Sequence, residues 1–249
     1  KSSSQLPSTP TFLDLPSQGR IQGQESHVAL VDLHPGQTLR AEAGSLLFLT
    51  DGVTMETKLA GASAALSRVL TGQSVFVTDY RYEGDSGHGT VGLGTAFPSK
   101  LLPIHLEDHP DHALICQRGA FLACNGTDTV EITTEMTHNL TTGFLGGQGF
   151  ILQRLSSLQQ GQVWIQAGGT VVRKELPPGE VLRVTSGSIV AFETTVQYKI
   201  QTMPGIQNAM FGGEGLFVTT LTGPGTVWLQ GLPADRMIAE IVRRVPSGA

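Results

Sequence analysis

Leu33–Leu49 reads LHPGQTLRAEAGSLLFL and Leu176–Phe192 reads LPPGEVLRVTSGSIVAF, and the two stretches are identical at seven of seventeen positions without a gap. Between them, Pro110–Ala123 (PDHALICQRGAFLA) follows the same register, at offsets of 75 and 68 residues from its neighbours. Self-similarity at a fixed register predicts three copies of one structural module. The alignment superposes one proline, one leucine and one glycine of each copy: Pro35, Pro110 and Pro178; Leu39, Leu114 and Leu182; Gly44, Gly119 and Gly187.

Each module start predicts a turn, a strand, a bend and a second strand. Pro-Gly opens the first and third copies, because proline fixes φ and glycine accepts the positive φ of a tight turn. The shared glycine further on marks a bend or bulge between two strands. The second half of the module also recurs, since Gly146–Leu155 matches Gly212–Leu221 and each leads into a Val-Trp-x-Gln run. We expect the tryptophans of these runs, Trp164 and Trp228, to be packed where modules meet.

The composition favours a sheet protein with many turns. Of the 249 residues, 15% are charged and 39% hydrophobic, with 31 glycines and 13 prolines, which is typical of short strands joined by turns. We therefore predict an all-β fold of three repeated modules with a short C-terminal helix. The predicted organisation is a disordered or processed tail over residues 1–25, modules at about 26–106, 107–175 and 176–234, and the helix and a tail over 235–249.

Two local predictions concern the C-terminal helix and the cysteines. The helix is expected to follow Pro233 with Asp235 as its N-cap and an apolar face. Cys116 and Cys124 are expected on one continuous strand, as buried thiols too far apart for a disulfide.

Several of these segments resemble the altered inheritance of mitochondria 24 family. The residues that carry the resemblance are Gly44-Ser45, Gly119–Ala123, Gly149, Pro178–Glu180, Val190–Phe192, Phe211–Leu216 and Gly223–Gln230. The resemblance covers roughly residues 26 to 234. It implies a fold of the double-stranded β-helix type, similar to that of the trp RNA-binding attenuation protein, with three related β modules around a pseudo-threefold axis in one chain. It also implies a mitochondrial location and a role in mitochondrial biogenesis, and it supplies no catalytic residues. The segment from Tyr82 to Leu106 departs from the family pattern and is expected to be an elaborated loop.

Two patterns suggest ligands and are weighed against plainer readings. Gly87–Gly92 spells the dinucleotide pattern G-x-G-x-x-G, but no helix signal follows it, so no nucleotide and no other cofactor is predicted. The densest group of potential metal ligands is His105, His109 and His112, which could bind zinc on a helix. Pro110 breaks such a helix, and the module alignment favours a polar turn.

No nucleophile paired with a base was found, so we do not expect an enzyme. The leading hypothesis is a non-enzymatic scaffold or binding protein in mitochondria, in the matrix or at the inner membrane, that works with other proteins of a larger complex. RNA binding by analogy of fold is the first alternative, although the net charge of −5 weighs against it. A metal-binding protein or enzyme that uses the His105–His112 loop is the second alternative. No apolar run reaches the about 18 residues that span a bilayer, while peripheral association with a membrane stays open.

Overall fold

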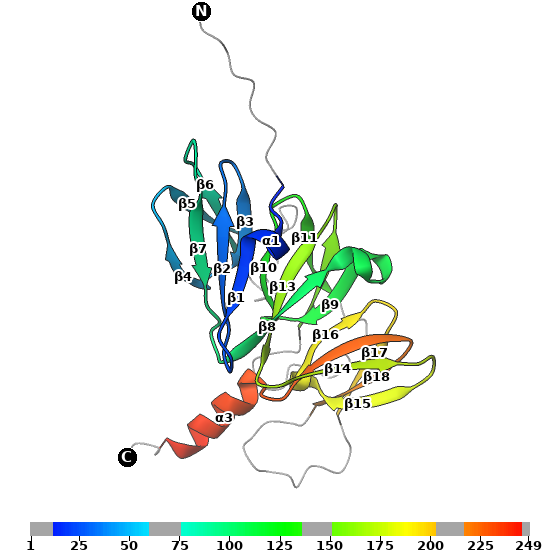
Figure 1. The fold of residues 1–249 in the computed structure, drawn as a ribbon. Helices are drawn as coiled ribbons and strands as arrows, with labels where there is room; N and C mark the ends of the chain where they lie inside the picture. Colours follow the sequence, from blue (N-terminus) through cyan, green and yellow to red (C-terminus); the bar gives the residue numbers. More distant parts are fainter. Residues whose placement is uncertain (1–11, 60–75, 136–150, 203–216, 246–249) are drawn as a thin grey trace, which may run out of the picture.

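The computed structural model describes residues 12–59, 76–135, 151–202 and 217–245. These residues form nineteen strands in four antiparallel sheets, three short 3-10 turns, a one-turn helix near the start of the described chain and a helix of three turns near the C-terminus (Figure 1). The predicted all-β fold with a C-terminal helix is thus confirmed. Neither helix in the described part of the chain has the length and apolar character of a bilayer span.

One order of strand pairing occurs three times along the chain. In each module the first strand pairs with the sixth and the sixth with the third, while the second pairs with the fifth and the fifth with the fourth. The first module comprises β2 (Val28–Leu33), β3 (Thr38–Glu42), β4 (Leu46–Leu49), β5 (Val53–Leu59), β6 (Phe76–Tyr82) and β7 (Gly89–Leu93). The second comprises β8 (Ser99–His105), β9 (Ala113–Gln117), β10 (Phe121–Cys124), β11 (Val130–Glu135), β12 (Leu152–Ser157) and β13 (Gln162–Gly168). The third comprises β14 (Val171–Leu176), β15 (Val181–Thr185), β16 (Ile189–Glu193), β17 (Gln197–Thr202), β18 (Phe217–Thr222) and β19 (Gly225–Gln230).

Neighbouring modules share sheets. One sheet runs β5-β6-β3-β10-β13-β8 and joins the first module to the second, and another runs β11-β12-β9-β16-β19-β14 and joins the second to the third. The other two sheets, β1-β2-β7-β4 and β15-β18-β17, belong to the first and third modules alone. Three core clusters of buried apolar side chains fill the space between these sheets, and continuous hydrogen bonding across modules makes them one framework.

The turn that opens each module has a left-handed residue at one shared position, and in the second module His112 is left-handed as well. Gly36 and Gly179 each have φ of +79°, as the Pro-Gly pattern predicts. Asp111 holds the same position in the second module with φ of +54°, and aspartate tolerates this region better than most residues. Pro110 therefore starts a short 3-10 turn, η2 (Pro110–His112), rather than a Pro-Gly turn.

The three aligned glycines do not share one conformation. Gly44 and Gly119 have φ of +87° and +82°, so an L-residue would be strained there. Gly187 lies in η3 (Ser186–Ser188) without a positive φ, and an added Cβ would meet only Pro233 at 3.5 Å. The bend at the shared glycine is thus left-handed in the first two modules, and it is a 3-10 turn in the third.

Each module has one aromatic side chain opposite a small residue on the neighbouring strand. In the first module the aromatic residue is on the other strand of that pair. Trp164 on β13 lies opposite Ala123, and Trp228 on β19 lies opposite Ala191. In the first module the corresponding pair is Gly92 on β7 and Phe48 on β4. A Cβ on Gly92 would lie 2.4 Å from the Phe48 ring, so the large and small residues have exchanged places. Both tryptophans are almost fully buried in core clusters, as expected.

Four expectations need correction. Part of the expected N-terminal tail is ordered: α1 (Leu15–Gln18) and β1 (Gly19–Gln22) are formed, Leu15 is buried, and β1 pairs with β2. The Tyr82–Leu106 segment contains β7 and β8, so it is chiefly sheet rather than an elaborated loop.

Cys116 and Cys124 lie on separate strands, β9 and β10, because the left-handed Gly119 turns the chain between them. Both are buried free thiols. The C-terminal helix, α3 (Ala234–Arg244), has Pro233 rather than Asp235 at its N-cap; Asp235 lies in the first turn, where it faces the positive end of the helix dipole.

Candidate functional site

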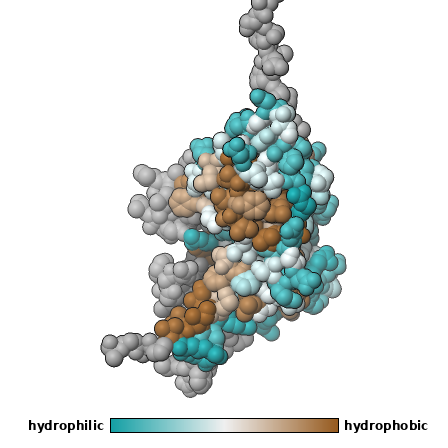
Figure 2. All heavy atoms as spheres, turned by 60° about the vertical axis from the view of Figure 1, so that its left-hand side comes forward, coloured by the Kyte–Doolittle hydropathy of each residue, from teal (hydrophilic) through white to brown (hydrophobic). Residues whose placement is uncertain are grey.

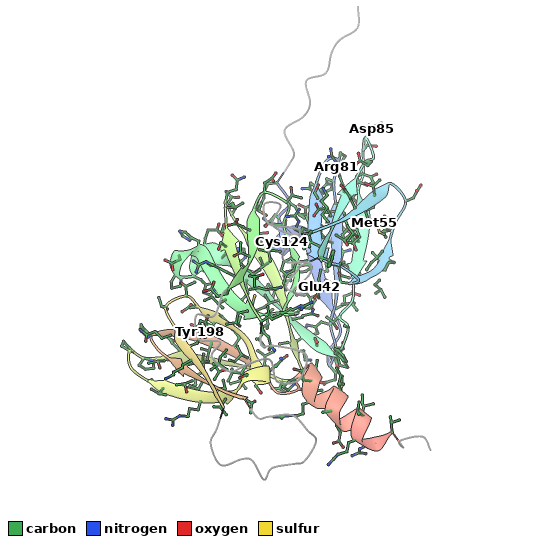
Figure 3. The ribbon with its side chains drawn as sticks, turned by 180° about the vertical axis from the view of Figure 1, so that it is seen from behind. Glu42, Met55, Arg81, Asp85, Cys124 and Tyr198 are labelled. Carbon is green, nitrogen blue, oxygen red and sulfur yellow. The ribbon has the colours of Figure 1, made fainter. Side chains whose placement is uncertain are left out.

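The candidate site is a depression where the three modules meet. It has a volume of about 220 Å³ and is lined by residues of β3, β9, β13 and the turns that hold Gly119 and Gly187, together with the start of α3. Figure 3 shows one of its residues, Glu42, near the middle of the molecule. Each module contributes the end of its second strand or the turn after it, so equivalent positions of the three modules form the site.

Glu42 is the ionisable centre of this depression. Its Oε2 accepts a hydrogen bond of 2.9 Å from Gln166 Nε2. Burial raises the pKa of the Glu42 carboxyl to about 7, while the hydrogen bond from Gln166 and the charge of Arg118 act in the opposite direction. The carboxyl therefore gains or loses its proton close to neutral pH.

Two glutamines repeat one structural role in the depression. Gln166 Nε2 donates to the carbonyl oxygen of Gly119 at 2.9 Å, and Gln230 Nε2 donates to that of Gly187 at 2.8 Å. Each glutamine ends the Val-Trp-x-Gln run of its module and fixes the turn after the second strand. Neighbouring Gln117 has a buried Oε1 without a hydrogen-bond partner among the described residues.

Sequence reasoning missed Glu42, Gln166 and Gln230 as site residues. The two glutamines had a signal, because they recur at one register of the repeat. Glu42 had a weaker one: it is the acid at the position where the other modules have Gln117 and Thr185.

The predicted histidine cluster does not form one centre. His109 Nδ1 lies 2.9 Å from Glu193 Oε1, and its ring meets the Trp228 ring edge to face at 5.5 Å. His112 Nδ1 instead lies 3.3 Å from the Glu107 carbonyl oxygen, and His105 is exposed at the end of β8. In the part of the chain that the structure describes, no three His, Cys, Asp or Glu side chains are placed to hold a metal. His109 serves the contact between the second and third modules.

The G-x-G-x-x-G pattern is placed on a strand. Gly89 and Gly92 lie in β7, which pairs with β2 and β4. A phosphate site of the dinucleotide kind needs the last glycine to open a helix, and β7 leads into a bend and β8. Gly92 is explained by the Phe48 ring that covers it.

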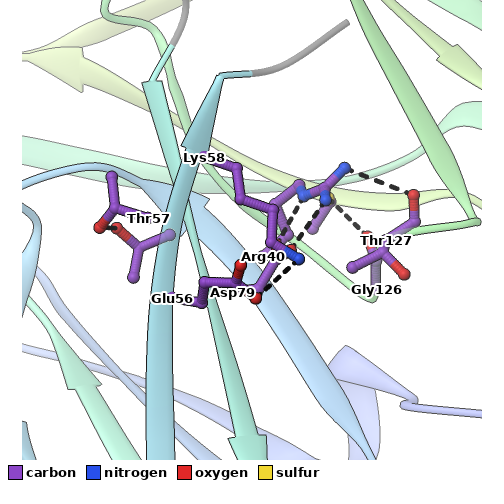
Figure 4. Close-up of polar contacts among 9 residues, drawn as sticks. Arg40, Glu56, Thr57, Lys58, Asp79, Gly126 and Thr127 are labelled. Atoms are coloured by element: carbon purple, nitrogen blue, oxygen red, sulfur yellow. Dashed lines mark hydrogen bonds and ion pairs between the residues drawn. The ribbon is translucent and has the colours of Figure 1, made fainter. Parts of the chain in front are cut away.

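A second polar cluster lies at the junction of the first two modules (Figure 4). Arg40 holds Asp79 through two hydrogen bonds of 2.7 and 2.9 Å, and Lys58 lies 3.4 Å from the same carboxylate. Arg40 Nη1 also reaches the carbonyl oxygen of Thr127 in the second module, at 3.4 Å. The charges of Arg40, Lys58 and Asp79 are thus paired within the cluster, and the hydrogen bond from Arg40 to Thr127 links the first two modules.

The described groups do not supply a nucleophile with its base. Ser99 is the one hydroxyl among the described residues that line the depression, and its Oγ donates to the Phe97 carbonyl oxygen. Burial raises the pKa of both Cys116 and Cys124 to about 12, which keeps them as thiols. In this depression Glu42 can take up or release a proton, while the side-chain amide nitrogens of Gln166 and Gln230 already donate hydrogen bonds within the protein.

Comparison with known proteins places the chain in a family. The model of the family described as mitochondrial biogenesis AIM24 matches residues 19–232. An uncharacterised protein of Streptococcus pyogenes serotype M6 is 23% identical over 227 residues, which cover 88% of this chain and 87% of the relative. The crystal structure of protein SPYM3_0169 from Streptococcus pyogenes superposes with a TM-score of 0.70 at 22% identity, over 90% of this chain and 99% of that one, and shows the same fold. The chain belongs to the mitochondrial biogenesis AIM24 family.

Proposed function

We propose that this chain is a non-enzymatic scaffold, a subunit or organiser of a larger protein assembly that serves mitochondrial biogenesis. The description of its family motivates the process and the mitochondrial location. The two relatives named above come from a bacterium, so the binding role, rather than the compartment, is the part that they would share.

The observation that carries the proposal is the exposed apolar face of α3. Ile238, Ile241 and Val242 follow a spacing of three and four residues, which places them on one side of α3, and Val245 follows directly after the end of the helix. They are between 44% and 64% exposed, and the helix extends from the body of the sheets (Figure 1). An amphipathic helix of this kind fits an apolar groove on another protein subunit.

The test is purification of the tagged full chain from its native cells, with proteins identified by mass spectrometry and RNA by sequencing. The proposal expects one or more proteins in stoichiometric amounts that rebind when purified components are mixed. An Ile241→Asp/Val242→Asp variant should lose them, while Arg236→Ser on the polar face of α3 should keep them. Stoichiometric RNA with no protein partner, or a purified chain that turns over a substrate, would contradict the proposal.

A further inference from the structure

The two junctions between consecutive modules use equivalent strands in one register. At the first junction β3 pairs with β10, and Ala41 lies opposite Ala123. At the second, β9 pairs with β16, and Cys116 lies opposite Ala191. Cys116 follows Ala41 by 75 residues and Ala191 follows Ala123 by 68, which are the two repeat offsets. The module therefore carries one fixed way of joining the next.

The same rule leaves two strands over, β4 of the first module and β15 of the third. Each is the edge strand of its sheet, and the strand pairs within the described ranges do not join them. They lie at opposite ends of the arc that the sheets make (Figure 1). An edge strand presents a row of backbone groups ready to pair with another strand. The described residues therefore include the two strands that a third junction would need, but these strands do not pair with each other. Each of the two strands with its side chains is called one half of that junction below.

The half on β4 is apolar and uncovered. Leu47 is 58% exposed, whereas the residues at its position in the other modules, Leu122 and Val190, are 0% and 1% exposed. Leu122 is packed in a core cluster with the first module, and Val190 in one with the second. Phe48, next to Leu47, is 42% exposed. Figure 2 shows hydrophobic residues gathered on this side of the first module.

The half on β15 is uncovered in the same sense. Leu182 is only partly buried, while Leu39 and Leu114, which hold its position in the other modules, are fully buried. Val181 at the start of β15 is 51% exposed. Both surfaces therefore lack the cover that their equivalents receive from a neighbouring module.

The charges of the two halves are complementary. At the first junction Arg40 reaches across to the turn after β10, where its Nη1 meets the Thr127 carbonyl oxygen. Arg183 holds the position of Arg40 on β15 and is exposed. The turn after β4 has exposed Asp51 one residue before the position that matches Thr127. An arginine on one half would meet an acid on the other.

We propose that this protein associates head to tail with a second copy of itself, through antiparallel pairing of β15 of one copy with β4 of the next. The register of the two formed junctions sets Val184 opposite Phe48 and Arg183 opposite Leu49. Because the two surfaces differ, the contact is heterologous, and it repeats until a ring closes or a chain of copies grows. The proposal goes beyond the function proposed above and does not depend on it, since it involves strands distant in sequence from α3.

The first test is the oligomeric state of the full chain by analytical ultracentrifugation over about a hundredfold range of concentration. We expect mass above that of one chain, with a concentration dependence. Leu47→Asp should weaken association by more than about tenfold, because it buries a charge in the junction. Leu158→Asp is the matched control, since Leu158 is equally exposed, at 61%, on a turn outside both surfaces; it should associate like the unchanged chain. Thermal melting establishes that each variant is folded.

The second test separates this junction from any other self-contact. Arg183→Glu and Asp51→Lys should each weaken association at low salt, and the chain that carries both should recover it, because the pair is then reversed. Leu47→Asp disrupts only the β4 surface, and Arg183→Glu weakens only the β15 surface. In a mixture, β15 of the first variant can still pair with β4 of the second, so one-to-one dimers should form and should not grow further. A monomer at every concentration overturns the proposal. So does association that survives Leu47→Asp or is lost only with Ile241→Asp/Val242→Asp in α3.

Discussion

Replacing Glu42 by glutamine should remove a pH dependence of stability from this protein. The carboxyl has a pKa of about 7 when folded, against an ordinary value of 4.5, so the folded state holds its proton where the unfolded state has released it. At about 1.4 kcal/mol for each pH unit between these values, the free energy of unfolding falls by up to about 3 kcal/mol as pH rises from about 4.5 to 7. Above pH 7 the free energy of unfolding no longer changes through Glu42, because its carboxyl is then ionised in both the folded and the unfolded state.

Glutamine has nearly the same shape and stays neutral, so Glu42→Gln should be more stable than the unchanged chain at about pH 8 and equal to it near pH 4.5. The assay is urea unfolding of both proteins at several pH values in that range. Glu131→Gln is the control, because Glu131 is exposed on β11. Burial lowers the pKa of His27, which makes stability rise with pH up to about 6.5 in every variant. The difference between the variants cancels that effect, and parallel pH profiles for Glu42→Gln and the unchanged chain would refute the reasoning.

Three further outcomes follow from the same geometry. Gly119→Val should cost about 1–3 kcal/mol of unfolding free energy because of its positive φ, whereas Gly187→Ala should change stability by less than about 0.5 kcal/mol; equal costs would mean that backbone conformation does not separate them. Gly92→Ala should destabilise through its contact with the Phe48 ring, and the loss should shrink in a Phe48→Ala background, so additive effects in chemical denaturation would contradict the packing. The purified chain should bind single-stranded RNA weakly from about 50 to 200 mM salt in fluorescence anisotropy; tight binding that falls steeply with salt would favour the RNA alternative.

The repeat was predictable because its turn and strand signals are local in sequence. Pro35 and Gly36 specify a turn by their own backbone preferences, and the same pattern recurs at Pro178. Gly187 shows the limit of that logic, because an aligned glycine need not keep a left-handed conformation when the turn becomes 3-10.

The site and the strand in the divergent segment depend on contacts between distant residues. Glu42 and Gln166 are separated by 124 positions, and their contact exists only once the first two modules are assembled. β7 was not predicted, because Gly92 makes the segment resemble a loop. The side chain that fills the space over Gly92 is Phe48, which lies on β4. The strand propensity of a short segment does not show that a large side chain on one strand fills the space left by a glycine on another.

The positions of the two thiols give each module junction its own reporter. Cys124 lies opposite Arg40 at the first junction, and Cys116 lies opposite Ala191 at the second. A thiol with a pKa of about 12 scarcely reacts while it is enclosed, so alkylation has to wait until the surrounding strands separate. The rate at which each cysteine is labelled then measures how often its own seam opens, without any probe added to the chain. Unequal rates would reveal that one end of the arc detaches before the other.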